Sequence, residues 1–154
     1  FKQKTAYEIP KRDWSSDVCS SDLWEGMMTA AHYKLDNLTA IVDRNFCQID
    51  DRTENVMTLE PLSDKWRAFG WNVIECDGNN IEEFLFAVDT AKKVKGKPTV
   101  LIAKTFMGKG VSFMEDDYKW HGVPPNDEQG KKALSELPPT KYGDFITFDW
   151  ETAK

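Results

Sequence analysis

Three short strand-like runs, separated by two stretches of helical periodicity, constrain the possible folds of this chain more than any other feature. Residues 38–42 and 98–103 are mainly apolar and contain several β-branched residues, whereas residues 71–76 alternate between apolar and polar. Runs of this kind, bounded by polar residues, are typical of buried strands. The order strand, helix, strand, helix, strand with short links predicts parallel pairing through right-handed crossovers. The sequence therefore predicts an α/β fold, a parallel sheet with flanking helices.

Apolar residues at helical spacing mark one buried face on each helix expected beside the sheet. Helices are expected ahead of the first run and at residues 59–70, 81–94 and 126–137. Asn80 and Glu83 have the spacing of a capping box at the start of the second of these ranges. The expected buried positions of the first three helices are Met27, Met28, Ala30, Ala31 and Leu35; then Leu62, Trp66 and Phe69; then Ile81, Phe84, Leu85, Val88 and Ala91.

Composition and charge exclude several classes of function. The chain has 154 residues, of which 40% are hydrophobic and 30% charged, a balance that suits one globular unit. A formal net charge of −6 without a basic stripe argues against nucleic-acid binding. No apolar run has the length of a membrane span, and the sequence begins without a secretory apolar region. Cys19, Cys47 and Cys76 are widely spaced and predict neither a disulfide framework nor a zinc site, so a reducing cytoplasm is the simplest location.

The first apolar run ends at Asp43, Arg44 and Asn45, polar residues at the point where a parallel strand would reach its carboxyl end. Ligands of open α/β sheets bind at that edge. The amide oxygen of Asn45 suits a hard cation such as Mg²⁺ or Ca²⁺. Asn also tolerates left-handed backbone and caps its own chain, so these residues alone favour a turn role for Asn45 over a metal-binding role.

Residues 53–58 are polar and predict a surface loop.

The segment after the third run is a second place where chemistry is expected. Its Gly-Lys-Gly motif at 108–110 would let backbone approach a phosphate, with the lysine adding positive charge, although G-x-G also occurs in ordinary tight turns. The acids at 115–117 look like a metal cluster, but adjacent acids in a loop are more often solvated. His121 alone reads as an exposed imidazole ahead of two prolines.

Several blocks of sequence occur in one order over residues 24–137. They read W-E-G-M-M-T-A-A-H-Y-K-L-D-N-L, I-V-D-R-N, Q-I-D, E-P-L-S-D-K-W-R-A-F-G-W, K-G-K-P-T-V-L-I-A-K-T, G-K-G-V-S-F-M-E and W-H-G. In these blocks the chain resembles the second half of the thiamine-diphosphate-binding domain of transketolase. The resemblance is closest to the split form, in which this N-terminal domain is a separate subunit.

The resemblance implies a set of site residues. In the family a Gly-Asp-Gly motif opens the thiamine signature and an Asn closes it; Asn45 matches the closing Asn, whereas Gly-Asp-Gly is absent from this sequence. Asn45 and the backbone carbonyl of Cys47 are then the expected ligands of Mg²⁺, or Ca²⁺, on the diphosphate. Ile49 and Met107 match apolar residues that contact the thiazolium ring of the cofactor. His121 matches a family His beside the diphosphate and the substrate, and it is the expected catalytic residue.

The loop that carries these residues departs from the family at some positions. Phe46 and Asp51 stand where many relatives have Gly, and both replacements cost backbone freedom in a loop that wraps a ligand. An alternative to this backbone role is that the Cys47 side chain acts as a thiolate ligand or nucleophile, but no neighbouring His or second Cys supports it. We therefore expect Cys47 to act through its backbone.

What the resemblance implies for function is transfer of a two-carbon ketol unit between sugar phosphates, with thiamine diphosphate and Mg²⁺ as cofactors. In the family the Glu that activates the cofactor belongs to the partner, so the expected assembly is a heterotetramer with a C-terminal transketolase subunit. Other thiamine enzymes, such as a deoxyxylulose-phosphate synthase or a dehydrogenase component, share the closing Asn and the Gly-Lys-Gly loop. A further alternative is an inactive fragment that only packs on a partner, which the missing Gly-Asp-Gly favours.

The two ends of the chain differ from its middle. Residues 1–23 show no sustained period, do not match the family and resemble the translation of a short-read sequencing adapter, so we expect a non-native leader. Residues 24–138 form the expected partial thiamine-diphosphate-binding domain. Residues 139–154 form a tail that is too apolar to stay free and is expected to dock on this domain or on a partner; its aromatic residues are Tyr142, Phe145, Phe148 and Trp150.

Overall fold

A computed structural model of the chain describes residues 20–139, and these residues divide into two compact units. We call the unit that contains the β-sheet the sheet unit, and the other unit the loop unit. Their described residues are 20–44 and 59–104 for the sheet unit, and 45–58 and 105–139 for the loop unit.

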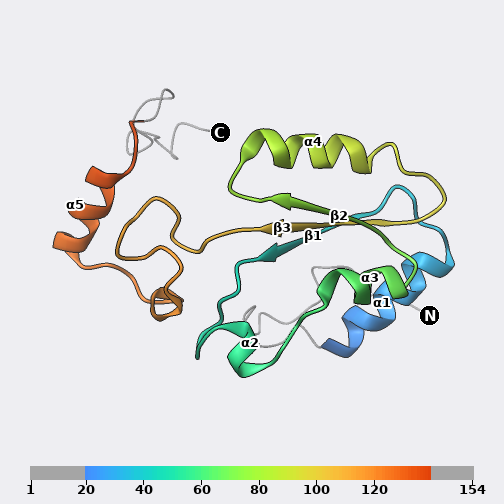
Figure 1. Cartoon of the computed structure of the whole chain (residues 1–154), viewed down its shortest axis with the longest axis horizontal. Helices are drawn as coiled ribbons and strands as arrows, with labels where there is room; N and C mark the ends of the chain where they lie inside the picture. The colour runs from blue at the N-terminus through green and yellow to red at the C-terminus, as the bar shows by residue number, and fades with distance from the viewer. Residues whose placement is uncertain (1–19, 140–154) are drawn as a thin grey trace, which may run out of the picture. The chain divides into compact units, whose positions relative to one another are not determined.

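The sheet unit contains a three-stranded parallel sheet, as the sequence predicts (Figure 1). Its strands are β1 (Thr39–Arg44), β2 (Asn72–Asp77) and β3 (Thr99–Lys104), in the spatial order β1-β3-β2. The register aligns the carboxyl ends of all three strands, because Lys104 pairs with Arg44 on one side and with Asp77 on the other. The prediction of an α/β fold with parallel pairing is therefore confirmed.

Helices cover both faces of this sheet. Helix α4 (Ile81–Ala91) lies over one face, and helices α1 (Ser20–His32) and α3 (Leu62–Ala68) lie over the other (Figure 1). The α4 side contains the buried residues Cys76, Ala87, Ala91, Leu101 and Ala103. The opposite side contains Met27, Ala30, Trp66, Trp71, Val100 and Ile102. Successive residues of β3 thus point into different cores, as the two-residue period of a strand requires.

Two tryptophans connect α1 and α3 in the second core. The rings of Trp66 and Trp71 meet edge to face with centroids 4.9 Å apart. The buried Trp71 Nε1–H donates to the backbone carbonyl of Met27 at 2.9 Å, which satisfies the polar tip of an otherwise apolar side chain. The predicted buried face of residues 59–70 is confirmed, since Trp66 is buried and Leu62 and Phe69 pack against the same core.

Several predicted element boundaries are wrong, and two of these differences concern the first strand and the segment that follows it. The first strand does not end at residue 42 but continues through Asp43 and Arg44, because β3 extends to Lys104 and offers them a hydrogen-bonded partner. Residues 53–58 are not entirely a loop: Thr53–Val56 form the short helix α2. Thr53 is buried there and its N–H donates to the carbonyl of Phe46 at 2.9 Å, so tertiary contacts order a polar segment.

The predicted buried stripe of α4 is partly wrong. Ile81 and Leu85 are 74% and 56% exposed, whereas the small Ala87 is buried. Helix α4 packs mainly against β2 and β3, and Ile41 of β1 is 57% exposed. The sheet is therefore too narrow to cover the whole apolar face that the periodicity predicts. The predicted stripe of α1 is also partly wrong, since Met28 is 50% exposed, and Leu35 lies beyond the end of the helix and is 39% exposed.

Helix caps agree with the sequence in part. Asn80 accepts from the N–H groups of Glu82 and Glu83 at 3.1 and 3.2 Å, as an N-cap residue should. The carboxylate of Glu83 does not close the predicted capping box, because it accepts instead from the N–H of Asp77 at 2.9 Å. A complete capping box, formed with Asn126, opens α5 (Asp127–Glu136).

The helices between residues 20 and 139 lack the combination of length and apolar character that crossing a bilayer requires. Helix α1 begins before the domain boundary expected at residue 24. The rest of the leader, residues 1–19, and the aromatic side chains of the expected tail lie outside the described residues.

Helix α1 ends in a Schellman motif with a lysine at the usual glycine position. The N–H of Leu35 donates to the carbonyl of Ala30, and the N–H of Lys34 donates to that of Ala31, both at 3.1 Å. Lys34 has φ +52°, the left-handed conformation that glycine adopts without strain. The motif therefore stores backbone strain at an exposed side chain.

Replacing Lys34 by Gly should stabilise the chain by about 1 kcal/mol, because it removes the left-handed penalty of a residue with a Cβ. Lys34→Ala is the matched control, since it shortens the side chain but keeps the Cβ. Urea unfolding of the full chain, followed by tryptophan fluorescence, measures both. Equal stability of the two variants would contradict this account of the strain.

Hydrogen bonds that involve side chains hold the loop unit together. The hydroxyl of Ser112 donates to Glu136 Oε1 at 2.9 Å, and the N–H of Ser112 donates to Glu136 Oε2, so the last turn of α5 is docked on the loop at residue 112. The short 3₁₀ helix η2 (Tyr118–Trp120) follows in the same loop, where Trp120 Nε1–H donates to the Phe113 carbonyl at 2.7 Å.

The docking of α5 should depend on pH. The N–H of Ser112, then its hydroxyl and the charge of Lys132, lower the pKa of Glu136 from its ordinary value of 4.5. A carboxyl whose pKa is lower in the folded state stabilises that state above the unfolded pKa and loses the contribution as pH falls through the folded pKa. The contact should persist at neutral pH and weaken below pH 4.5.

The NMR signal of the Ser112 amide, followed from pH 7 to pH 3, measures this effect. Glu136→Gln is the control, because a neutral amide should abolish the pH dependence at Ser112. A pH-independent Ser112 signal in the unmodified chain would show that the ionised carboxylate of Glu136 does not hold α5 in place.

Candidate functional site

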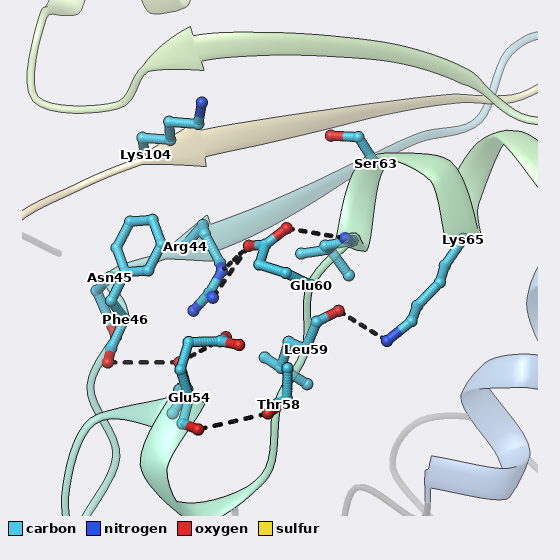
Figure 2. A network of polar contacts seen from close by, with 12 residues as sticks. Arg44, Asn45, Phe46, Glu54, Thr58, Leu59, Glu60, Ser63, Lys65 and Lys104 are labelled. Carbon is cyan, nitrogen blue, oxygen red and sulfur yellow. Dashed lines mark hydrogen bonds and ion pairs between the residues drawn. The ribbon is translucent and has the colours of Figure 1, made fainter.

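Strand β1 ends in a buried cation. Arg44 is 2% exposed, and its Nε and Nη2 both donate to Glu60 Oε1 at 3.1 Å (Figure 2). The other oxygen of Glu60 accepts from the N–H of Leu62 at 2.9 Å, at the start of α3. A buried arginine requires such a partner, since desolvating an unpaired charge is costly. The pair therefore fastens the carboxyl end of β1 to α3, a role that the sequence reading of Arg44 as a strand terminator missed.

Asn45 begins a tight turn directly after this strand. Its Oδ1 accepts from the N–H of Cys47 at 3.0 Å, so the side chain caps its own backbone. Phe46, between them, has φ +61°, the left-handed conformation for which glycine is best suited. The turn interpretation of Asn45 is thus part of the structure. It does not exclude ligand binding, because an amide oxygen has a second lone pair.

Cys47 lies opposite Arg52 in an isolated antiparallel bridge. The bonds of this bridge run from the N–H of Thr53 to the carbonyl of Phe46 at 2.9 Å, and from the N–H of Gln48 to the carbonyl of Asp51 at 3.0 Å. Since these bonds flank Cys47, its own carbonyl takes part in neither of them. This geometry suits the predicted backbone ligand.

The thiol of Cys47 is buried, with 7% of the residue exposed. Burial raises the pKa of this thiol, and the nearby carboxylate of Asp116, whose Oδ1 lies 4.0 Å from Sγ, raises it further. The thiol is therefore neutral at pH 7, and a neutral thiol is a poor metal ligand and nucleophile. The interpretation of Cys47 as a thiolate gains no support.

Asp116 connects the loop around Cys47 with the loop around Met107. Its carboxylate pairs with Nη2 of Arg52, and its N–H donates to the carbonyl of Met107 at 2.8 Å. Like Phe46, it is a non-glycine residue in left-handed backbone, with φ +60°. The sequence reading had placed Asp116 among solvated acids, because nothing in a linear pattern pairs it with an arginine 64 positions away.

The Gly-Lys-Gly motif is used by the loop itself. A Cβ on Gly108 would come within 2.8 Å of the Met114 carbonyl oxygen, so the missing side chain makes room for the loop's own backbone. The ammonium of Lys109 pairs with Glu115 at 2.8 Å, and the N–H of Gly110 donates to the same carboxylate. These contacts hold the loop closed.

Ile49 and His121 are the most exposed of the predicted site residues. Ile49 is 59% exposed. His121 is exposed directly after η2, and its backbone N–H donates to the Tyr118 carbonyl at 2.9 Å. Within the described residues the imidazole of His121 makes no hydrogen bond to Asn45 or Cys47, and the aliphatic side chain of Ile49 cannot form one. The structure thus brings the neighbourhoods of Cys47 and Met107 together through Asp116, and it leaves Ile49 and His121 at the surface.

The oxygen atoms at Asn45 and Cys47 suit a hard cation in chemical type, since amide and backbone carbonyl oxygens are ligands of Mg²⁺ and Ca²⁺. They include no carboxylate. Residues 20–139 contain no group of three His, Cys, Asp or Glu side chains arranged to hold a metal ion. The acids at 115–117 are engaged elsewhere, with Lys109, with Arg52 and with the N–H of Lys119 respectively. The described residues therefore fit part of a magnesium site.

Comparison with known proteins identifies the class. Residues 16–145 match the family model described as "Transketolase, thiamine diphosphate binding domain". The chain is 43% identical over 125 residues to the 6-deoxy-6-sulfo-D-fructose transketolase subunit SqwG of Clostridium sp. (strain MSTE9), covering 81% of this chain and 45% of the relative. It is 40% identical over 139 residues to a subunit of the apulose-4-phosphate transketolase of Phocaeicola vulgatus, covering 86% of this chain and 50% of the relative.

Solved structures show the same fold. The crystal structure of transketolase from Campylobacter jejuni superposes with a TM-score of 0.68 at 34% identity, over 73% of this chain and 17% of that one. The transketolase of Pichia stipitis in complex with sedoheptulose 7-phosphate gives a TM-score of 0.69 at 29% identity, over 76% of this chain and 17% of that one.

The parallel sheet with helices on both faces places this chain among the open α/β proteins. More particularly, the chain belongs to the family of thiamine-diphosphate-binding N-terminal domains of transketolase. The resemblance seen in the sequence is thereby confirmed. The chain spans about half the length of these two relatives, 45% of one and 50% of the other.

Proposed function

We propose that this chain forms part of the cofactor site of a split transketolase, which transfers a two-carbon ketol unit between sugar phosphates with thiamine diphosphate and Mg²⁺. The observation that carries the proposal is the turn after β1. In the sequence Asn45 matches the family's closing Asn. Its amide oxygen and the Cys47 carbonyl, which lie on the two sides of this turn, are both oxygens of the kind that Mg²⁺ accepts.

Each candidate residue has a distinct role in this proposal. Asn45 and the Cys47 carbonyl hold the metal on the diphosphate. Ile49 and Met107 supply apolar contact to the thiazolium ring; Ile49 is exposed enough to receive one. His121 donates a hydrogen bond to a phosphate or substrate oxygen and is the candidate for proton transfer. When bound, thiamine diphosphate supplies the stabilisation of a substrate carbanion.

A second polypeptide is part of the proposal. Two relatives carry the word subunit in their names, which supports a C-terminal partner for this chain. Two such pairs would form the proposed heterotetramer. Sugar phosphates are the proposed substrates, since one relative is named for apulose 4-phosphate. We place the assembly in the cytoplasm, because the sequence has no disulfide framework and Cys47 and Cys76 are free thiols.

Binding by the 154-residue chain itself should be weak. The proposed metal site holds two neutral protein oxygens, and a Mg²⁺ site gains much of its affinity from carboxylate and phosphate oxygens. We expect thiamine diphosphate with Mg²⁺ to bind this chain no better than about millimolar, near −4 kcal/mol. Isothermal titration calorimetry measures it. Micromolar binding by this chain would show that the ligand set is misjudged.

A chimaera tests Asn45 under stronger binding. It joins this chain to the part of the Phocaeicola vulgatus relative that the chain does not span, together with the second polypeptide of that relative's enzyme. Binding should then reach about the micromolar range, and Asn45→Ala should weaken it by roughly a decade or more. Asn37→Ala, an exposed turn residue in the sheet unit, is the control and should leave binding unchanged. Equal binding by both variants would remove Asn45 from the metal site.

His121→Ala in the same chimaera should lower turnover by about 10²-fold while leaving the unfolding midpoint unchanged, because a positioned proton donor contributes to rate rather than to packing. His32→Ala is the matched control, since His32 is an exposed imidazole on α1. Steady-state assays with a ketose phosphate donor compare the two variants. Similar turnover for both would return His121 to the class of ordinary surface residues.

A further inference from the structure

The sequence offered no reason to connect Arg52 with Asp116, yet their ion pair is a contact between the two loops that carry the candidate site. Arg52 belongs to the segment that contains Asn45 and Cys47. Asp116 belongs to the segment that contains Met107 and His121. The pair spans 64 positions of sequence and lies wholly within the loop unit.

Each partner is tied by backbone to a different part of the candidate site. Arg52 lies opposite Cys47 in the antiparallel bridge, so its position is coupled to the turn that begins at Asn45. The N–H of Asp116 donates to the Met107 carbonyl at 2.8 Å. Joining the two side chains therefore sets the distance between the Cys47 turn and the Met107 segment.

We propose that Arg52 and Asp116 are positioning residues, whose ion pair holds the Asn45–Cys47 turn in its metal-binding geometry before any ligand arrives. The inference rests on the proposed function, since it assigns a purpose to the geometry of that turn. It goes beyond that function by naming a pair that touches neither metal nor cofactor in the proposal.

The exposure of the pair argues for a positioning role over a stabilising one. The Arg52 and Asp116 side chains are 43% and 30% exposed, and ion pairs that are open to solvent contribute little to folding stability. Two residues of the joined loops, Phe46 and Asp116, nevertheless stay in left-handed backbone at φ +61° and +60°. Strained backbone of this kind persists where surrounding contacts over-determine it.

Charge makes the role testable, because positioning and simple electrostatics predict opposite signs. Arg52 is a cation near a proposed cation site and cannot be a metal ligand. If it acted only through its charge, Arg52→Met would strengthen metal binding at the turn. If it positions the turn, the same substitution weakens metal binding there.

The experiment uses the full 154-residue chain with Mn²⁺ alone as a paramagnetic probe, which reports binding even at millimolar affinity. Broadening of the Asn45 and Cys47 backbone amide signals in ¹⁵N spectra is measured during the titration. Arg52→Met should reduce the apparent Mn²⁺ affinity at these amides by about tenfold, as loss of a supporting group beyond the ligands commonly does. Arg52→Lys should restore most of it, because a cation returns to the same place.

Two further variants complete the design. Arg52→Met combined with Asp116→Asn removes the carboxylate that the first substitution leaves unpaired, and so excludes new binding at Asp116 itself. Arg67→Met is the matched control, because it breaks a surface ion pair with Asp64 in the sheet unit. It should leave broadening at the turn unchanged. Unchanged signals of the sheet-unit amides in every variant show that the fold is intact.

Amide hydrogen exchange at Cys47 decides the positioning role independently of metal. Its N–H is bonded to Asn45 Oδ1, and its protection should fall in Arg52→Met and recover in Arg52→Lys. Unchanged protection in Arg52→Met, or stronger Mn²⁺ broadening at the turn, overturns the positioning inference. Lost protection in Arg52→Met, with no Mn²⁺ broadening at the turn even in the unmodified chain, supports positioning and counts against the proposed metal role.

Discussion

The structure depends on the burial of one strand. Strand β3 is paired on both sides and covered on both faces, and Val100, Leu101, Ile102 and Ala103 are each no more than 4% exposed. A strand in that position is apolar through its interior, which is why residues 100–103 do not alternate between apolar and polar. Both cores contain residues of β3, and the other strands are aligned by it. The parallel register also brings Arg44 and Lys104, the last residues of β1 and β3, side by side.

That alignment explains where the candidate site begins. Asn45 follows Arg44, and Thr105 follows Lys104, so the two segments of the loop unit leave the sheet from neighbouring strand ends. A parallel sheet thus brings together segments that are 60 residues apart in the sequence. Asp77, the last residue of β2, pairs with the same Lys104, but the chain returns from it into α4 within the sheet unit.

Much of this fold could be predicted from local patterns, because strand and helix periods depend on near neighbours. The central strand and the face of α3 marked by Trp66 are examples. The width of the buried stripe on α4 could not be predicted. Periodicity shows which direction a helix faces, whereas the exposure of Ile81 and Leu85 depends on how many strands lie beneath it. Likewise α2 forms in a polar segment because Thr53 bonds to Phe46.

Single residues of the candidate site could be proposed from the sequence, whereas a pair that joins two loops could not. Asn45, Cys47, Met107 and His121 could be named from their matches to a family motif. Asp116 could not, since its partner Arg52 lies in another loop. Adjacent acids look alike in a sequence, but here each has a different partner. A sequence signal for such a pair would have to come from correlated change at both positions, and a single sequence contains none.

The turn seen at Asn45 is compatible with the proposed metal-binding role of the same residue. As a turn residue, Asn45 accepts the N–H of Cys47, and that bond also sets where its amide oxygen and the Cys47 carbonyl lie. In the proposed site these two oxygens are ordered beforehand, and so do not have to lose that conformational freedom when a cation binds. Phe46 shows that the order is imposed from outside the turn. It keeps φ +61°, a left-handed conformation that is unfavourable for a residue with a Cβ. A contact from outside residues 45–47 supports it, because the Phe46 carbonyl accepts the N–H of Thr53. The turn is therefore a product of the loop unit as a whole, and its chemistry cannot be separated from the contacts that close that unit.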